Sequence, residues 1–589
     1  MENHYGLLLI WLFPVLGGIV AFVLGKKNQS TRNDCIDIVM FAEFIMLICM
    51  GYQIAKKWST LSLNLNNILG LGLSFSMDYI RLLFCFVVTL VFGIVSLFMK
   101  ESLREEKGSN RFYLLYMGLF SMALGACLSD NFFCFVLFVT FAFLFAYPMI
   151  VHRPNTLALK NAGIYLTFSV AAVLLFMSGL VVLFGYMGSI SYTGVYSMVI
   201  INGYSKGAFI GGMLLFAGFA ICAGLFPLQF QVTRGNSYGL IETSAVLTCT
   251  VSKLGVLGIL LLGANMMGGS GIYGRTLLVM GIATAVWGLC VTLTATDIRK
   301  ILMGLDVTVN GMNVLAASLM VIATEANGYI VRSSLYIMVT SSISLMVLYM
   351  VALEMLRKID TYEIKGLIAS GKQHKLLAVG CFLACASLAG VPGTAGFLAY
   401  SLFYTFILKN VGWKWLLVLF LVLWAFLATA VVRVFMKFFV SKKDETLRIL
   451  STEEELSGAG KVPNDNENDG ETDESAKEAA TKSENPYRMG EIMLLILGVI
   501  QVVIGVLPAK TVERLSEAVN VYFRGRELSG TVSYYTADTW IAFGIIAALC
   551  LFLYLNLVHG ILLRVIRDKK NRKLQMENEQ QEETISDDM

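Results

Sequence analysis

The chain has 589 residues, of which 57% are hydrophobic and only 15% are charged, and its mean hydropathy is +0.71. Average soluble proteins are about 45–50% apolar and about 25% charged. The composition therefore excludes soluble enzymes, fibrous proteins, disulfide-rich secreted proteins and nucleic-acid-binding proteins. It predicts an all-α polytopic membrane protein.

The net charge of +4 is the sum of two unlike parts. Residues 444–485 carry thirteen acidic and four basic side chains, and the tail 574–589 carries six acids and no base. The rest of the chain then holds 41 bases against 22 acids. Basic loops around an apolar body are typical of integral membrane proteins.

Long apolar runs predict about 14–15 transmembrane helices, because about 20 apolar residues in a helix cross the hydrocarbon core of a bilayer. The first run has an acidic start and no basic segment before it, so we expect a true span and not a cleaved signal peptide. In chain order the runs lie at about 5–24, 35–55, 75–99, 112–129, 131–151, 161–186, 207–230, 241–266, 274–296, 301–323, 328–353, 375–400, 412–440, 489–508 and 539–566.

The loop lysines and arginines predict the orientation of these spans in the plasma membrane. The positive-inside rule places base-rich loops in the cytoplasm, which puts the N-terminus outside and the C-terminus inside. Residues 441–488 are expected to form a disordered acidic cytoplasmic linker, with partner docking as the alternative. The base-rich loops carry Lys26, Lys27, Arg32, Lys100, Arg104, Lys107, Arg111, Arg153, Lys160, Arg234, Arg299, Lys300, Arg357, Lys358, Lys365, Lys372, Lys375, Arg567, Lys569, Lys570, Arg572 and Lys573.

The eleven cysteines and four histidines predict no metal or cofactor site. The sequence has no Cys-x-x-Cys and no Cys/His cluster of the kind that holds zinc or an iron–sulfur cluster. Nearly all the cysteines lie in apolar runs, where we interpret them as small buried hydrophobic side chains. Nucleotide, flavin and haem motifs are also missing, so we expect no cofactor and no catalytic residues.

Two spans are interrupted in matching ways. One reads Ala223-Gly224-Leu225-Phe226-Pro227 and the other reads Ala389-Gly390-Val391-Pro392-Gly393. Proline removes a backbone donor, and in lipid the freed carbonyls need partners. Such breaks at Pro227 and Pro392, in corresponding halves, indicate a transporter built from repeats; simple packing kinks are the alternative.

Around these breaks the sequence resembles the antiporter-like membrane subunits of respiratory complex I, of Mrp-type cation/proton antiporters and of energy-converting membrane-bound hydrogenases. Each motif is short, but the set occurs in the family's order from about Asp78 to Pro508. The matching stretches are Ser76-Met77-Asp78, Ser129-Asp130-Asn131-Phe132-Phe133, Gly224-Leu225-Phe226-Pro227-Leu228, Ser244-Ala245 with Ser252-Lys253-Leu254-Gly255-Val256, Thr296-Asp297-Ile298-Arg299-Lys300 with Gly311, and Ser387-Leu388-Ala389-Gly390-Val391-Pro392 with Ala395-Gly396-Phe397.

The resemblance implies two five-helix repeats of inverted topology around a charged, hydrated axis at mid-membrane. With the composition, it divides the chain into N-terminal transmembrane helices (1–110), a first repeat (111–266), a second repeat (274–440), the linker (441–488), C-terminal transmembrane helices (489–573) and an acidic tail (574–589).

The chain lacks most of the family's proton-site side chains. The eighth-span lysine, Lys253, remains. The neutral replacements hold water but do not readily ionise near pH 7, so the sequence supports the fold and leaves proton translocation open. The departures are Thr140 for the fifth-span Glu, Cys222 for the seventh-span Lys, Thr340 and Ser344 for the eleventh-span His and Lys, Tyr400 for the twelfth-span Lys or Glu, and Gln229, Gln231 and Arg234 for the His, Trp and Asp after Pro227.

Four other charged positions fall in or near spans. Glu43, near the middle of the second span, is interpreted either as a functional acid or partner contact, or as a water-facing position. Asp78 can pair with Arg81 on one helix face. Glu242, about three turns before Lys253, is a candidate for the polar entrance to that lysine. Asp306 is a candidate countercharge for Lys253.

Together these features predict an antiporter-like membrane subunit of a multisubunit complex that moves protons or monovalent cations. Its expected partners are the lipid bilayer and other membrane subunits, with no nucleic acid. The complex would resemble an NADH–quinone oxidoreductase, a membrane-bound hydrogenase or an Mrp antiporter. Two alternatives are open: a non-conducting structural or assembly subunit, and a stand-alone secondary transporter.

Overall fold

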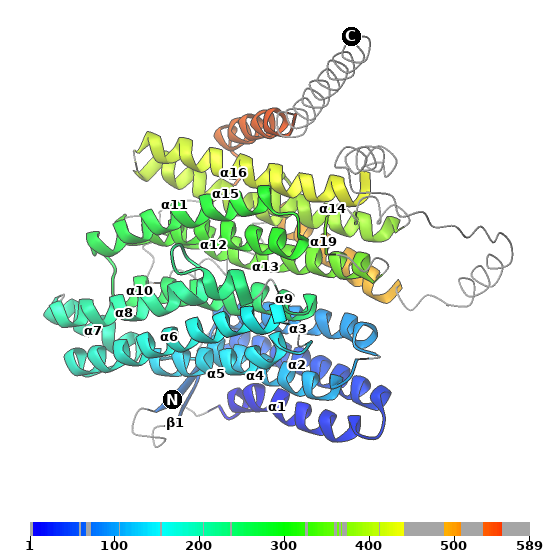
Figure 1. Cartoon of the computed structure of the whole chain (residues 1–589). Helices are drawn as coiled ribbons and strands as arrows, with labels where there is room; N and C mark the ends of the chain where they lie inside the picture. Colours follow the sequence, from blue (N-terminus) through cyan, green and yellow to red (C-terminus); the bar gives the residue numbers. More distant parts are fainter. Residues whose placement is uncertain are drawn as a thin grey trace, which may run out of the picture.

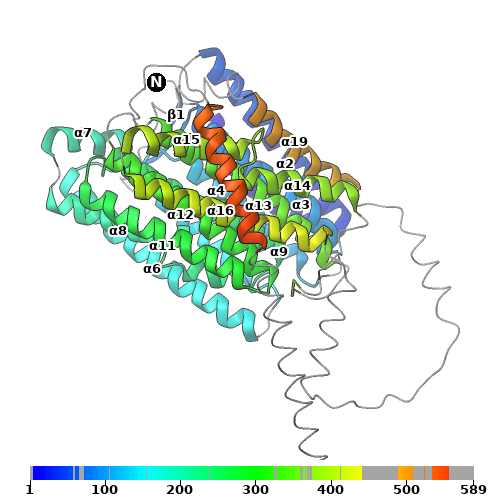
Figure 2. The same cartoon turned by 90° about the horizontal axis from the view of Figure 1, so that it is seen from above.

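The computed structural model describes residues 4–57, 60–65, 72–104, 106–153, 156–203, 205–235, 238–323, 328–357, 362–364, 367, 374–411, 413–440, 488–507, 523 and 534–555. Thirteen helices within these ranges are long and apolar enough to cross a membrane. They run side by side in one bundle (Figures 1 and 2). With one broken span and the shorter α19 (Arg488–Val506), they account for the apolar runs of the sequence and confirm an all-α polytopic membrane protein.

The N-terminal part is a four-helix unit with a hairpin that the sequence patterns do not predict. Its helices are α1 (Gly6–Gly25), α2 (Gln29–Lys57), α3 (Tyr79–Ser102) and α4 (Ser109–Leu128). Strands β1 (Leu61–Leu65) and β2 (Leu73–Met77) pair antiparallel, with Leu61 opposite Met77. Buried side chains of the hairpin, such as Phe75, pack into the helix core, so the loop between the second and third spans is built into the fold.

The next helices lead to the first interrupted span. They are α5 (Phe132–Ile150), α6 (Thr156–Met187), the short α7 (Tyr192–Asn202), which the apolar runs do not predict, and α8 (Lys206–Ala223). A π turn, η1 (Gln231–Gly235), follows the break. The outer face of α6 is exposed and apolar, as expected for a helix that faces lipid or another subunit.

The centre of the bundle is the span Ile241–Asn265, which is fully buried by its neighbours. It comprises α9 (Ile241–Val246), the π turn η2 (Leu247–Val251) and α10 (Ser252–Asn265). Next come α11 (Gly271–Thr294), α12 (Ile298–Ile322) and α13 (Gly328–Leu356). A methyl group on Gly281 would lie 2.8 Å from the Leu315 nitrogen, so glycine is what lets α11 and α12 approach backbone to backbone.

The last part begins with the second interrupted span, α14 (Lys375–Ala389) and α15 (Ala395–Phe406), which ends in the π turn η3 (Ile407–Val411). It continues with α16 (Lys414–Phe435), the π turn η4 (Met436–Val440), α19 and the helix Ala537–Leu555. The expected linker, apart from Arg488 at its end, and the acidic tail lie outside the described residues.

Candidate functional site

The first helix break lies beside the centre of the bundle. Helix α8 stops at Ala223, and Gly224 adopts a left-handed conformation with φ 71° that suits a residue without a Cβ. The chain then passes Pro227 and does not resume as an α-helix before η1. The structure thus interrupts this span where the sequence predicts a break, which leaves carbonyls at the end of α8 in need of donors.

Lys253 lies at the middle of the buried span, in the first turn of α10, directly after the π turn η2. Its Nζ donates to Asp306 Oδ1 at 2.7 Å and to Asn310 Oδ1 at 2.7 Å. The second carboxylate oxygen of Asp306 accepts from Ser252 Oγ at 2.9 Å and from Asn310 Nδ2 at 3.2 Å. Lys253 is 4% and Asp306 0% exposed, so this is a buried ion pair with its polar atoms engaged.

The same network also holds the broken helix. Asn310 Nδ2 donates to the Ala223 carbonyl at 3.1 Å, which is one of the acceptors freed by the break. The Cys222 thiol donates to the Val251 carbonyl at 3.3 Å, at the end of the π turn. The break, the π turn and the Lys253 ion pair are therefore one connected structure, joined mainly through Asn310.

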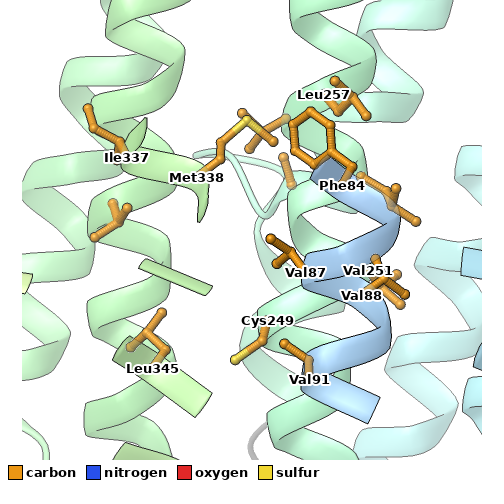
Figure 3. Close-up of a cluster of buried hydrophobic side chains, with 14 of the residues drawn as sticks. Phe84, Val87, Val88, Val91, Cys249, Val251, Leu257, Ile337, Met338 and Leu345 are labelled. Atoms are coloured by element: carbon orange, nitrogen blue, oxygen red, sulfur yellow. The ribbon is translucent and has the colours of Figure 1, made fainter. Parts of the chain in front are cut away.

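A small cavity opens on the other side of Lys253. Its volume is about 20 Å³, which is enough for one water molecule. Lys253, Thr250 and Ser342 are among the residues that line it. The remaining wall is mostly apolar; Figure 3 shows side chains from α3, α13 and the central span that line it, including Phe84, Val87, Val88, Cys249, Leu257 and Met338.

The second break begins with the same left-handed glycine at the helix end and has different chemistry. Helix α14 ends at Ala389, and Gly390 has φ 72°. Here Trp424 Nε1 donates to the Ala389 carbonyl at 2.8 Å, and Tyr400 Oη donates to the Leu388 carbonyl at 3.3 Å. Two neutral aromatic side chains thus satisfy the freed acceptors, where the first break uses a charged network.

Three further positions at which the family's ionisable side chains are missing, Thr140, Thr340 and Ser344, carry neutral hydroxyl groups. Thr340 Oγ1 donates to the Tyr336 carbonyl at 2.7 Å, and Thr140 Oγ1 has no hydrogen-bond partner among the described residues. Ser344 bonds Gln501 in both directions, at 3.1 and 3.2 Å. Gln501 comes from α19, 157 positions away, and an isolated Gln in an apolar run gives no signal in the sequence by which this contact could be predicted.

The remaining candidate acids are not hydrogen-bonded to Lys253. Glu242 is 1% exposed in the first turn of α9, and its Oε1 has no hydrogen-bond partner among the described residues. The π turn η2 lies between Glu242 and Lys253, so the straight-helix spacing expected from the sequence does not hold. Glu43 is 0% exposed at the middle of α2 and therefore does not face water.

Asp78 and Arg81 form the ion pair that the sequence predicts, and this pair is part of a larger hydrogen-bonded cluster. Asp78 caps α3 by accepting from the Ile80 and Arg81 nitrogens at 3.0 and 2.8 Å. Arg81 also donates to Asp130 at 2.6 Å, and Asp130 accepts from Ser76 at 3.0 Å. This cluster ties the hairpin to α3 and to the turn between α4 and α5, which is a structural role.

No group of three or more His, Cys, Asp or Glu side chains in the described part of the chain could hold a metal ion. What the centre offers is a buried lysine that donates hydrogen bonds to a carboxylate and an amide oxygen and lies beside a small cavity. Such an arrangement can bind, hold and pass a proton at Lys253 Nζ.

Comparison with known proteins agrees with this geometry. The family described as NADH:quinone oxidoreductase/Mrp antiporter, transmembrane, matches residues 129–437. Hydrogenase-4 component B of Escherichia coli (strain K12) is 20% identical over 337 residues, covering 56% of this chain and 50% of that protein. A Na(+)/H(+) antiporter subunit from Bacillus subtilis (strain 168) is 21% identical over 402 residues, covering 67% of this chain and 79% of that protein.

A solved structure carries the same fold over nearly the whole chain. A chain of the Mrp complex from Dietzia sp. DQ12-45-1b superposes with a TM-score of 0.75 at 17% identity, covering 93% of this chain and 56% of that chain. The chain thus spans about half the length of the hydrogenase component and of the Mrp chain. The family match covers more than half of the sequence and includes both helix breaks and Lys253. The chain belongs to the NADH:quinone oxidoreductase/Mrp antiporter transmembrane family and is an antiporter-like integral membrane subunit.

Proposed function

We propose that this chain moves protons across the membrane as one subunit of a multisubunit complex, with Lys253 as the proton carrier of its first repeat. The observation that carries the proposal is the buried Lys253–Asp306–Asn310 network at the first helix break. An intramembrane charge costs about 2.5–3.5 kcal/mol on insertion scales. A subunit that served only as a spacer would be more stable with neutral side chains at its centre.

The chemistry of the centre favours a proton over a metal cation. The Lys253 ammonium already occupies the carboxylate of Asp306, so a cation would have to displace it. A proton needs only to leave Nζ, and Asp306 and Asn310 remain as acceptors that guide its return. The cavity beside Lys253 provides room for the water that would take the proton.

Glu242 is the proposed entrance to this carrier. It is a buried acid with an unpartnered oxygen, in the first turn of the same span. Hydroxyl groups lie between it and Lys253: Thr248, which is 3.2 Å from the Tyr349 hydroxyl, and Ser252.

Neutral and charge-conserving changes at Lys253 test the proposal. Lys253→Met and Lys253→Arg should both reduce proton transport while the complex assembles, because arginine keeps its charge and does not release its proton near pH 7. Transport is measured in sealed membrane vesicles by the quench of a pH-sensitive dye, and assembly by purification through a tag on this chain. Full transport with Met at position 253 would overturn the proposal.

The partners and the orientation belong to the same proposal. The relatives are components or subunits of larger assemblies, and the exposed apolar outer faces of α2 and α6 provide area for other membrane subunits and for lipid. We place the chain in the plasma membrane with its N-terminus outside and residues 441–488 in the cytoplasm. Labelling of single introduced cysteines from each side of the membrane tests this, and outside labelling within 441–488 would reverse it.

A further inference from the structure

Glu43 occupies a position that the Lys253 network does not use. It lies at the middle of α2, it is 0% exposed, and neither of its carboxylate oxygens has a hydrogen-bond partner among the described residues. A buried polar group without a partner costs free energy, and a buried charge without a partner costs more. An apolar side chain would be cheaper at this position, so the carboxyl calls for a functional explanation.

The charged groups around Glu43 do not neutralise it. On α2, Arg32 bonds Ser109 and covers the Tyr113 ring, and Asp37 is paired with Lys100 of α3. Helix α1 has no titratable side chain. At the N-terminal end of α3, Arg81 forms ion pairs with Asp78 and Asp130.

Two thiols connect Glu43 with the centre of the bundle. Cys85 of α3 is fully buried. Helix α3 packs against α2 next to Glu43, where the Phe44 and Phe86 rings lie 5.4 Å apart, and against α4, which carries Cys127. Cys127 in turn lines the cavity beside Lys253. Glu43, Cys85, Cys127 and the Lys253 cavity therefore form a row that crosses the N-terminal four-helix unit.

We propose that Glu43 is a second proton-binding site, which exchanges protons with the Lys253 cavity past Cys85 and Cys127. In this exchange the Glu43 carboxyl releases a proton, which passes Cys85 and Cys127 to water in the cavity, and later takes one up on the same oxygen, so Glu43 only breaks and re-forms its O–H bond. The inference rests on the proposed function, because it supplies Lys253 with a lateral source or acceptor of protons. The row runs toward α2, whose outer face is exposed and apolar.

The first test is chemical and uses the intact complex in membranes. N,N′-dicyclohexylcarbodiimide reacts with protonated carboxyl groups in apolar surroundings, and mass spectrometry of the α2 peptide locates the adduct. Glu43 should be modified, whereas Asp37 on the same helix should not, because it is paired with Lys100. Absence of modification at Glu43 in the wild-type protein would overturn the inference, whether or not any variant folds.

The second test follows transport. Glu43→Gln should lower proton transport and remove the part of the carbodiimide inhibition that is due to Glu43, while Glu43→Asp should retain both in part. Cys127→Val should reproduce the loss of transport because it makes the row apolar at similar volume, and Cys127→Ser should not. These paired variants separate a path for protons from a requirement for packing.

The outcomes distinguish this inference from the proposed function. Loss of transport in Lys253→Met together with wild-type transport and wild-type carbodiimide inhibition in Glu43→Gln would overturn only the role of Glu43. Wild-type transport in Lys253→Met would overturn the proposed function, and the connection of Glu43 to Lys253 would fall with it.

Discussion

Lys253 of α10 and Asp306 of α12 are 53 positions apart in the sequence, and their charged atoms meet at 2.7 Å in the middle of the bundle. Asn310, one turn after Asp306, bonds both of them and also the Ala223 carbonyl at the first helix break. A change in the charge of Lys253 is therefore felt directly at the end of α8. This link between a titratable side chain and a broken helix is what the proposed mechanism uses.

Asn310 should matter more for stability than its neighbour Asn313. Both are 0% exposed on α12, but Asn313 Nδ2 has no hydrogen-bond partner among the described residues, whereas Asn310 bonds on both its amide atoms. Asn310→Ala should cost about 1–3 kcal/mol, because it leaves the Ala223 carbonyl and part of the ion pair unsatisfied. Thermal unfolding of the purified protein in detergent compares Asn310→Ala with Asn313→Ala. Equal losses of stability in these two variants would contradict the account.

The second break should be a structural element. Trp424→Phe removes the donor to the Ala389 carbonyl and should destabilise the protein by about 1–3 kcal/mol. Tyr400→Phe should cost less, because its bond to Leu388 is longer, at 3.3 Å. Neither variant should change proton transport per assembled complex. A transport defect in Tyr400→Phe without loss of protein would place proton transfer in the second repeat, against our assignment.

The sequence predicts the spans well because burial in lipid demands long apolar helices with internally bonded backbones. It also predicts the two breaks, because the Gly and Pro residues at Gly224, Pro227, Gly390 and Pro392 act locally. The hairpin β1–β2 and the short α7 escape detection because they lie in loops whose packing depends on distant helices. Phe75, for instance, is buried because α1 and α5 bring Trp11 and Phe138 against it.

Contacts between side chains that are far apart in the sequence are harder to predict. Asp306 can be named as a candidate for Lys253 because a buried lysine calls for a countercharge, but Asn310 and Gln501 carry no such requirement. The π turn η2 is also invisible in the sequence, and it changes the spacing that a straight helix would give between Glu242 and Lys253. The pairing of Asp78 with Arg81 is local and predictable, whereas their link to Asp130 is not.

The Asp130 link gives a further prediction. Asp130 is the closer acidic partner of the buried Arg81, and it also holds Ser76 of the hairpin. Asp130→Asn should destabilise the protein by about 1–2 kcal/mol, since a charge-assisted hydrogen bond is weakened at a partly exposed carboxylate. Asp34→Asn, at an exposed position of α2, is the control and should have little effect. The measurement is again the unfolding temperature in detergent.

His152 should make the stability depend on pH. Burial lowers the pKa of His152 below its ordinary value; Glu106 opposes this, and Arg153 and Arg111 reinforce it. The unfolded chain then binds more protons than the folded one between the folded pKa and about 6.5, so stability should fall as the pH is lowered through this window. His152→Gln should reduce the difference in unfolding temperature between about pH 7.5 and about pH 5.5. An unchanged difference would contradict burial of the neutral imidazole.

The most direct test removes both members of the central ion pair. Lys253→Met alone leaves Asp306 buried without its cation, at an expected cost of about 3–5 kcal/mol, which lowers the amount of assembled complex without abolishing assembly. In the double variant Lys253→Met/Asp306→Asn the centre is neutral, and the amide oxygen of the new Asn side chain can still accept from Ser252 and Asn310. Proton transport by the assembled complex is then measured in sealed vesicles. The account predicts that the double variant assembles better than Lys253→Met and shows no more transport than it does; transport at the wild-type rate would contradict proton transfer through Lys253.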